Sequence, residues 1–244
     1  MNSKSGSPPD KRFHFKQFSL SDQGCAMKIG TDGVLLGSVA ANYQASRALD
    51  IGTGCGLIAL MLAQETKANI TALDPEAGAF TMALKNVAES PWPDRIVVLK
   101  ERFQDFAASV PGTFELIVCN PPYFRNSLQS PDQKRNQARH DDSLPAEDLF
   151  KGVSKIISPE GIFLIIVPAE QESEMEILAK KLGMKSRRKI LVRPNPGQNP
   201  KRIIMAFSPA PGAMLTEALS IETGQRHAYS QAYQALTKNF YLDF

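Results

Sequence analysis

Two features of the sequence, a glycine-rich turn and an aspartate downstream of it, could bind a ligand that carries hydroxyl groups. The stretch Asp50-Ile51-Gly52-Thr53-Gly54-Cys55-Gly56 follows a β-rich run and precedes a helical pattern, where a backbone without side chains can turn tightly and approach a ligand. Its GxGxG spacing differs from the GxGxxG that binds a pyrophosphate, and a structural turn is the alternative. Asp74 ends the next β-rich run and could accept both hydroxyls of a ribose, with a helix cap as its alternative. The pair predicts a site for a nucleoside-bearing cofactor.

The elements that would position these residues alternate along the chain. The β-rich runs are 48–51, 70–74, 96–99, 116–119 and 162–167, and the helical patterns are 57–64, 77–89, 146–157 and 172–182. Such alternation predicts a parallel, doubly wound sheet with helices on both faces. The runs 189–192 and 202–207 have only a loop between them and predict an antiparallel hairpin that closes one edge of the sheet. Thr31 or Asp32 is the expected cap of a helix that contains Val34.

Composition narrows the class of protein. With 244 residues, 43% hydrophobic content and a net charge of +3, the chain suits one large α/β domain, and its mild basicity permits nucleic-acid contact without requiring it. The three cysteines are far apart and the three histidines are isolated, so we expect reduced thiols and no metal site. No signal peptide or membrane span is expected, which predicts a soluble cytoplasmic protein. Residues 1–12 are expected to form a disordered tail, and 13–244 a single domain.

The DIGTGCG loop, Asp74 and the sequence Asn120-Pro121-Pro122-Tyr123 together resemble the class I S-adenosylmethionine-dependent methyltransferases. That resemblance implies a Rossmann-like fold whose seven-stranded, mostly parallel sheet has an antiparallel last strand, with S-adenosyl-L-methionine as cofactor. It implies a core at 47–208, preceded by a segment, 13–46, that covers the cofactor, and followed by an extension, 209–244, that packs on the core. The implied cofactor-binding residues of the loop are Gly52, Thr53, Gly54 and Gly56, and Asp50 would orient the loop or the cofactor amine.

The NPPY sequence suits a planar amine or amide nitrogen whose lone pair is delocalised, and the resemblance leaves adenine, cytosine and glutamine amides open as acceptors. The amide oxygen of Asn120 and the carbonyl of Pro121 could accept the two amine hydrogens and direct the lone pair toward a methyl donor. Pro121 and Pro122 hold this corner rigid, while Tyr123, with Phe124, would offer a ring on which a planar base can stack. The alternative is a rigid strand-to-helix connection with a buried aromatic residue.

A second resemblance covers nearly the whole chain. The stretches 15–18 and 25–37, the latter with the sequence KIGTDGVLLG, together with 90–92 and 229–241, are similar to the bacterial adenine-N6-methyltransferases that act on the adenine beside the anticodon of a valine tRNA. This similarity implies tRNA as partner and places Lys28, Thr31 and Asp32 at the methionine end of the cofactor. The relatives usually carry an acid after the third strand, where this chain has Arg102. Glu101, Asp105 or Gln104 could substitute, and Phe103 could pack on the cofactor's adenine.

Two basic regions are candidates for RNA contact. Arg139 lies in the polar segment 125–144, which could cover a flipped base or be a solvated loop. Arg188 and Arg193 belong to a cluster that also includes Lys185, Arg187, Lys189, Lys201 and Arg202, a concentration that suits phosphate contact. Alternating strand residues point to opposite faces, so not all of them can reach one RNA.

Three other functions stay open at this point. A glutamine methyltransferase of release factors shares NPPY, but its relatives carry a separate helical N-terminal domain. A methyltransferase of ribosomal RNA adenines also fits NPPY. An RNA-binding or assembly protein that retains the cofactor fold is the alternative without turnover, although such a protein need not keep the loop, Asp74 and NPPY.

Overall fold

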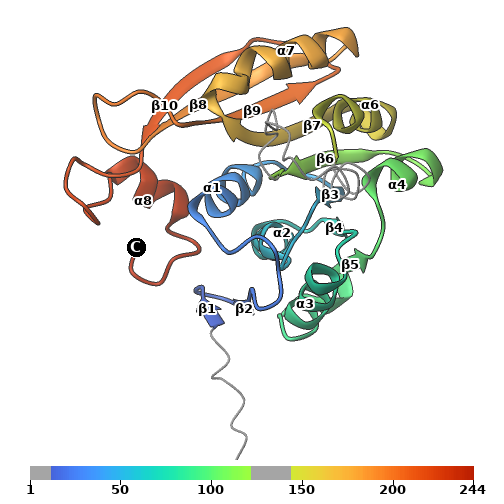
Figure 1. Ribbon diagram of the computed structural model, residues 1–244, viewed down its shortest axis with the longest axis horizontal. Coiled ribbons are helices and arrows are strands. Elements are labelled where there is room, and N and C mark those ends of the chain that lie inside the picture. The colour runs from blue at the N-terminus through green and yellow to red at the C-terminus, as the bar shows by residue number, and fades with distance from the viewer. Residues whose placement is uncertain (1–11, 122–143) are drawn as a thin grey trace, which may run out of the picture.

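The computed structural model describes residues 12–121 and 144–244 (Figure 1). The expected tail, 1–12, lies outside the described residues except for Arg12, which begins the first strand. The helices are α1 Thr31–Ala40, α2 Leu57–Glu65, α3 Ala77–Ala88, α4 Phe103–Ser109, α6 Ala146–Ile156, α7 Glu172–Lys181 and α8 Gln231–Thr237, with short 3₁₀ turns at Pro93–Arg95 and Ala169–Gln171. The strands are β1 Arg12–His14, β2 Ser19–Ser21, β3 Arg47–Ile51, β4 Asn69–Leu73, β5 Ile96–Leu99, β6 Phe114–Cys119, β7 Ile157–Pro168, β8 Lys185–Arg193, β9 Arg202–Ser208 and β10 Leu215–Ser220.

In the described part of the chain, eight strands form the central sheet in the order β10-β8-β9-β7-β6-β3-β4-β5, and β1 pairs with β2 separately. All neighbours in this sheet run parallel except β9, which is antiparallel to both β7 and β8. The expected doubly wound, mostly parallel sheet is therefore confirmed. Two details of the prediction were wrong. Among the described residues the sheet has eight strands, because the C-terminal extension adds β10. The β8–β9 hairpin closes no edge, because β10 lies outside it.

The two faces of the sheet bury two separate apolar clusters. Along β6, Leu116 and Val118 belong to one cluster and Ile117 and Cys119 to the other, as expected when successive side chains point to opposite faces. Helices α1, α2, α3 and α8 cover the first face and α4, α6 and α7 cover the second (Figure 1). This burial on both faces explains why the strands read as continuous apolar runs rather than alternating ones.

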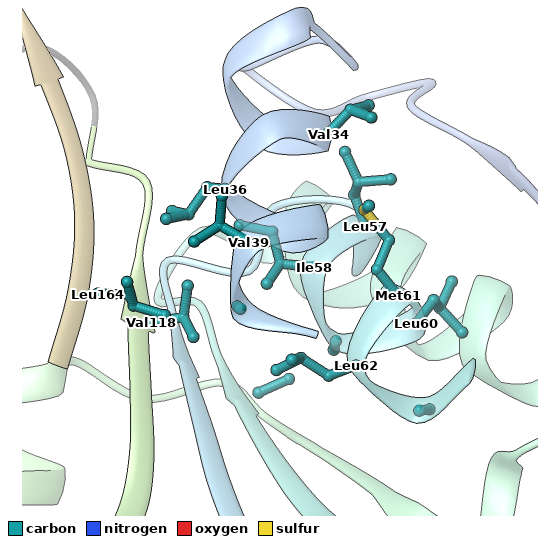
Figure 2. Close-up of a cluster of buried hydrophobic side chains, with 14 of the residues drawn as sticks. Val34, Leu36, Val39, Leu57, Ile58, Leu60, Met61, Leu62, Val118 and Leu164 are labelled. Carbon is teal, nitrogen blue, oxygen red and sulfur yellow. The ribbon is translucent and has the colours of Figure 1, made fainter. Parts of the chain in front are cut away.

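The packing of α1 on α2 fixes the helix that carries the KIGTDGVLLG sequence. Figure 2 shows Val34, Leu36 and Val39 of α1 meeting apolar side chains of α2, with Val118 and Leu164 of the sheet beside them. A Cβ atom at Gly37 would lie 2.5 Å from the sulfur of Met61, so a glycine at this position lets the two helices approach closely. The start of α1 is thereby held at a defined place above the sheet.

The terminal segments pack against one another. The backbone N–H of Lys16 donates to the carbonyl of Phe240 at 2.8 Å, and its ammonium group donates to the carbonyl of Lys238 at 2.6 Å. Tyr233 and Phe240 are buried in the first apolar cluster, so side chains of the C-terminal segment contribute to the core. The single domain expected from the sequence stays a prediction. The contacts of Lys16 with Lys238 and Phe240 support it.

The prediction that Thr31 or Asp32 caps the N-terminus of α1 was wrong. Gly30 occupies the N-cap position without a side-chain hydrogen bond, and Thr31 and Asp32 are the first two helical residues, where an acidic side chain interacts favourably with the helix dipole. Helix α4 was not anticipated, because the segment after β5 is short and only weakly periodic. No helix among the described residues has both the length and the apolar character needed to cross a membrane.

Candidate active site

A cavity of about 550 Å³ opens at the carboxyl ends of β3, β4 and β6, the edge at which open parallel sheets bind ligands. Its size falls within the range of small-molecule pockets, roughly 300–1,000 Å³. The predicted site residues that line it are Lys28, Thr31, Asp32, Gly52, Thr53, Gly54, Asp74, Arg102, Phe103, Asn120 and Pro121. Asp50 and Gly56 lie behind this lining, and Pro122, Tyr123, Phe124 and Arg139 lie outside the described residues.

The three glycines of the loop all adopt left-handed backbone conformations. The φ angles are 69° at Gly52, 58° at Gly54 and 88° at Gly56, a region that residues with a Cβ adopt only with strain. A Cβ atom at Gly52 or Gly54 would meet no atom of the described part of the chain within 4 Å. The glycines are therefore required by the backbone path of the turn, and the path leaves the face of the loop open to a ligand.

Asp74 joins the glycine loop to the start of α3. One carboxylate oxygen accepts from the N–H of Gly54 at 2.9 Å and the other accepts from the N–H of Glu76 at 3.0 Å. Burial, the largest influence, raises the pKa of Asp74. The helix cap itself is Glu76, whose carboxylate accepts from Gly78 and Ala79. The cap role considered for Asp74 thus belongs to its neighbour, and each Asp74 oxygen retains a lone pair that can accept a ligand hydroxyl.

Asp50 holds the loop from behind. Its Oδ2 accepts from the hydroxyl of Thr53 at 2.6 Å and from the N–H of Ala59 at 3.1 Å, while its buried Oδ1 has no hydrogen-bond partner among the described residues. Burial raises the pKa of Asp50 to about 7, against the lowering effect of those two hydrogen bonds. The side chain is therefore placed to orient the loop, one of the two roles expected for it.

The raised pKa of Asp50 predicts a pH-dependent difference between the protein and its Asp50→Asn variant. Because the folded-state pKa lies above the reference value of 3.8, the folded chain holds this proton more tightly than the unfolded chain between about pH 4 and 7, and the stability that protonation supplies is lost as pH rises. The variant should gain about 2–3 kcal/mol in unfolding free energy relative to wild type between pH 5 and pH 8. Urea unfolding at both pH values measures this, with exposed Asp94→Asn as control; equal differences at the two pH values would contradict it.

The segment from Cys25 to Gly33 forms one wall of the cavity. Asp22 fixes it by accepting from the N–H of Ile29 at 3.1 Å, and the ammonium group of Lys28 donates back to the carbonyl of Asp22 at 2.8 Å. Asp32 forms an ion pair with Arg202 at the start of β9, with 2.8 Å between Oδ2 and Nε. Lys28, Thr31 and Asp32, the residues predicted for the methionine end of the cofactor, therefore all line the cavity. The ion pair connects this wall to the start of β9.

Sequence reasoning missed the role of Gly33. A Cβ atom at this position would lie 3.0 Å from Leu57 Cδ2 and 3.7 Å from the amide nitrogen of Asn120. The absence of a side chain therefore lets the first turn of α1 pack closely on Leu57 at the start of α2, beside Asn120, which follows β6. The second glycine of the GTDG sequence was the available signal, but its meaning depends on which strand end α1 faces.

Sequence reasoning also missed Asn86, a fully buried residue of α3. Its amide group donates to the carbonyls of Ser21 and Cys55, each at 2.8 Å, and its oxygen accepts from the N–H of Ser21 at 3.0 Å. It thus ties β2 to the glycine loop with every bond satisfied. The signal was a polar residue on the face of α3 that also carries Ala79 and Ala83.

The unusual Arg102 precedes α4 as its N-cap and lines the cavity with Glu101 and Gln104. Phe103 is buried, and its ring packs so closely on α6 that a Cβ atom at Gly152 would be 2.4 Å from it. Phe103 therefore packs in the core and is also one of the residues that line the cavity. A contact between one of these residues and the adenine of the cofactor stays a prediction.

The basic cluster read from the sequence is dispersed in space. Lys189 is buried between Glu172 and Glu176 of α7, at 2.6 and 2.5 Å, and Arg188 pairs with Glu217 of β10 at 2.6 Å. Arg193 ends β8 at the same edge of the sheet as the cavity. Roles for Arg188 and Arg193 in RNA contact stay predictions. The ammonium group of Lys189 is instead neutralised by the two glutamates of α7.

The cysteines and the acids build no metal centre in the described part of the chain. Cys25, Cys55 and Cys119 are buried free thiols, and burial raises the pKa of Cys55 to about 12, so its thiol stays protonated. Within residues 12–121 and 144–244, no group of three His, Cys, Asp or Glu side chains could hold a metal ion.

Comparisons with known proteins agree with this geometry. Residues 26–187 match the family described as "Methyltransferase small domain". A tRNA1(Val) (adenine(37)-N6)-methyltransferase of Bacteroides thetaiotaomicron is 45% identical over 94% of this chain and 97% of its own length. Proteins of the same name from Phocaeicola vulgatus and Salmonella enteritidis are 43% and 40% identical, covering 96% and 94% of this chain and 99% and 94% of their own.

Solved structures support the fold without deciding the substrate. The protein Atu636 from Agrobacterium tumefaciens, a predicted O-methyltransferase, matches with a TM-score of 0.65 and 21% identity, over 86% of this chain and 96% of that one. A ribosomal protein L11 methylase from Lactobacillus delbrueckii matches with a TM-score of 0.54 and 19% identity, over 78% and 83%. These structures carry different acceptor specificities on one fold, so the acceptor must be argued from the site.

Proposed function

We propose that this chain, which belongs to the family of tRNA1(Val) (adenine(37)-N6)-methyltransferases, transfers a methyl group from S-adenosyl-L-methionine to the exocyclic N6 amine of an adenine in tRNA. The adenine at position 37 of valine tRNA, beside the anticodon, is the proposed target, by analogy with the relatives' names. A cytoplasmic location is part of this proposal, since the proposed substrate is a tRNA.

One observation carries the proposal: a single cavity contains both a set of groups suited to a nucleoside and an acceptor group suited to an amine. Asp74, Gly52 and Gly54 line it, and so do Asn120 and Pro121. A donor molecule and an acceptor amine bound to these groups would occupy the same enclosed space. This is the arrangement that direct transfer between two substrates requires.

The lining residues fit the cofactor in size and chemistry. The cavity of about 550 Å³ is walled by apolar side chains such as Ile29, Leu57 and Leu144 and by a few polar groups, as is usual for cofactor sites. Asp74 would accept from the ribose hydroxyls, the glycine loop would approach the nucleoside closely, and Thr31 with Lys28 would contact the methionine end. When bound, the cofactor supplies an activated methyl group on a sulfonium sulfur.

The acceptor side of the site is built by the end of β6. Asn120 offers an amide oxygen and Pro121 a carbonyl, two acceptors on consecutive residues for the two hydrogens of an adenine amine. Both hydrogen bonds would localise the nitrogen lone pair and aim it along the line of transfer, which is catalysis by position and electrostatics. Pro122 and Tyr123 complete the proposed corner, with Phe124 and Arg139 as further RNA contacts, although these four lie outside the described residues.

The proposal is tested by a transfer assay that identifies the modified nucleoside. The purified protein is incubated with radiolabelled S-adenosyl-L-methionine and total RNA from a strain that lacks the activity. We expect label in N6-methyladenosine, and after RNA fractionation we expect it in valine tRNA. Label in ribosomal RNA or in a protein would contradict the proposed acceptor, and the absence of transfer to any RNA would contradict the proposed reaction.

A further inference from the structure

A second cavity, of about 310 Å³, adjoins the first. We call it the flanking cavity. It is lined by Thr31, Asp32, Val192, Pro194, Lys201, Arg202 and Ile221, and three of these residues, Thr31, Asp32 and Arg202, also line the main cavity. The wall between the two spaces is therefore one layer of side chains thick, centred on the Asp32–Arg202 ion pair.

The flanking cavity lies on the same edge of the sheet as Asn120. Strand β8 runs parallel to β10, and both end there, while the antiparallel β9 begins there at Arg202. Gly33, next to Asp32, is a neighbour of Asn120, since a Cβ atom built on it would lie 3.7 Å from the amide nitrogen of Asn120. A chain of neighbouring residues thus leads from the proposed acceptor site through the start of α1 to Arg202 and Lys201.

The floor of the flanking cavity is rigid. The N–H of Lys201 donates to the carbonyl of Val192 at 2.9 Å, and the N–H of Ile221 donates to the carbonyl of Arg193 at 2.9 Å. These main-chain bonds lock the segments around Lys201 and Ile221 onto the end of β8. Apolar groups of Val192, Pro194 and Ile221 form part of the lining between them.

The charges at the flanking cavity leave one lysine available for an anion. Asp32 is matched by Arg202, and Lys201 is exposed and forms no ion pair with any carboxylate in the described part of the chain. An exposed ammonium group beside a rigid, partly apolar floor suits a phosphate linked to a ribose or a base, because the phosphate meets the cation and the remainder meets the apolar surface.

We propose that the flanking cavity binds the nucleotide next to the target adenine in the RNA chain, with Lys201 contacting its phosphate and the floor of Val192, Pro194 and Ile221 contacting its ribose or base. The inference rests on the proposed function, because it is the placement of the target adenine at Asn120 that puts the next nucleotide within reach. Consecutive nucleotides of one RNA chain would occupy the two adjoining cavities.

The test compares the full-length protein with Lys201→Ala. RNA affinity is measured by fluorescence anisotropy with a valine anticodon stem-loop, and methyl transfer is measured separately. The variant should bind this RNA about 5–10-fold more weakly near 0.1 M salt and should lower the slope of log K against log salt by about 0.7–0.9, the contribution of one phosphate. Its affinity for S-adenosyl-L-methionine should be unchanged, because Lys201 does not line the main cavity. Lys67→Ala is the matched control, since Lys67 is an exposed lysine just before the start of β4, at the opposite edge of the sheet and outside the basic cluster.

A set of stem-loops, each with one neutral methylphosphonate beside the target adenine, then locates the contact. For one phosphate, neutralisation should weaken binding to wild type about 5–10-fold and leave binding to Lys201→Ala unchanged. An equal penalty in both proteins at every position, or a variant with wild-type affinity and salt slope, would overturn the flanking subsite. A wild type that binds the RNA but transfers no methyl group would instead overturn the proposed function, so the two failures are distinct.

Discussion

Asn120→Ala should lower the rate of methyl transfer by at least about 10²–10³-fold while leaving the affinity for S-adenosyl-L-methionine within a few-fold of wild type. The substitution removes one of the two acceptors proposed to hold the adenine amine, and the loss of one such preorganised group typically has this cost. The glycine loop and Asp74 are bonded to one another and not to Asn120, so the cofactor side of the cavity should persist. Single-turnover transfer to valine tRNA, together with calorimetric cofactor binding, separates the two effects.

Two further variants make the Asn120 result specific. Asn120→Asp keeps an oxygen that can accept from the amine, so it should lose less activity than the alanine variant. Asn42→Ala is the matched control, because the Asn42 amide donates to the carbonyl of Ser38 at the end of α1, away from the cavity. It should leave turnover unchanged. Transfer by Asn120→Ala at a rate near that of wild type would remove Asn120 from the mechanism.

Asp74→Ala should weaken binding of S-adenosyl-L-methionine by roughly 10²–10³-fold. The carboxylate is proposed to accept two ribose hydroxyls, and hydrogen bonds to a charged group contribute about 1.5–3 kcal/mol each. The same substitution removes the acceptor of the Gly54 N–H, which leaves the loop less well positioned for its ligand. Calorimetric titration of the variant with the cofactor measures the loss, and saturating cofactor should restore part of the turnover.

Glu76→Ala is the matched control for Asp74, because Glu76 is an acid two residues away that also lines the cavity. Its carboxylate caps α3, so the variant should lose about 1 kcal/mol of stability and keep its cofactor affinity within a few-fold. If the two variants bound the cofactor equally well, Asp74 would not be the ribose acceptor.

Local features of the chain were enough to predict most of the cofactor side. The loop DIGTGCG, Asp74 at the end of a β-rich run and Asn120 at the end of another are each adjacent to the strand that positions them. In a parallel sheet all of these strand ends meet at one edge, so a correct reading of the strands also predicts that the residues gather there. The position of each residue next to a strand, together with the rule that parallel strands end at one edge of the sheet, was enough to predict this part of the cavity.

Contacts between distant segments could not be predicted in the same way. The pairing of Arg202 with Asp32 joins residues 170 positions apart, and Asn86 connects Ser21 with Cys55 across three elements. The eighth strand, β10, pairs with an edge that is exposed only once β8 and β9 have taken their places. A sequence pattern records which residues are apolar or polar, but not which partner will face them after folding.

The charged residues show most clearly the difference between what the sequence predicts and what only the fold decides. From the sequence, Lys185 to Arg202 was one basic cluster, because lysines and arginines recur along two neighbouring runs. In the fold, β8 sends Lys189 toward the acids of α7 and pairs Arg188 with β10, while Lys201 and Arg202 reach the flanking cavity. Amino-acid sequence was sufficient for the fold class, for the turn of the glycine loop and for the position of Asn120 after β6, since each depends on neighbouring residues and strand ends. Tertiary structure alone decided which charged groups are neutralised and which face a ligand, because that depends on the partners folding brings within a few ångströms.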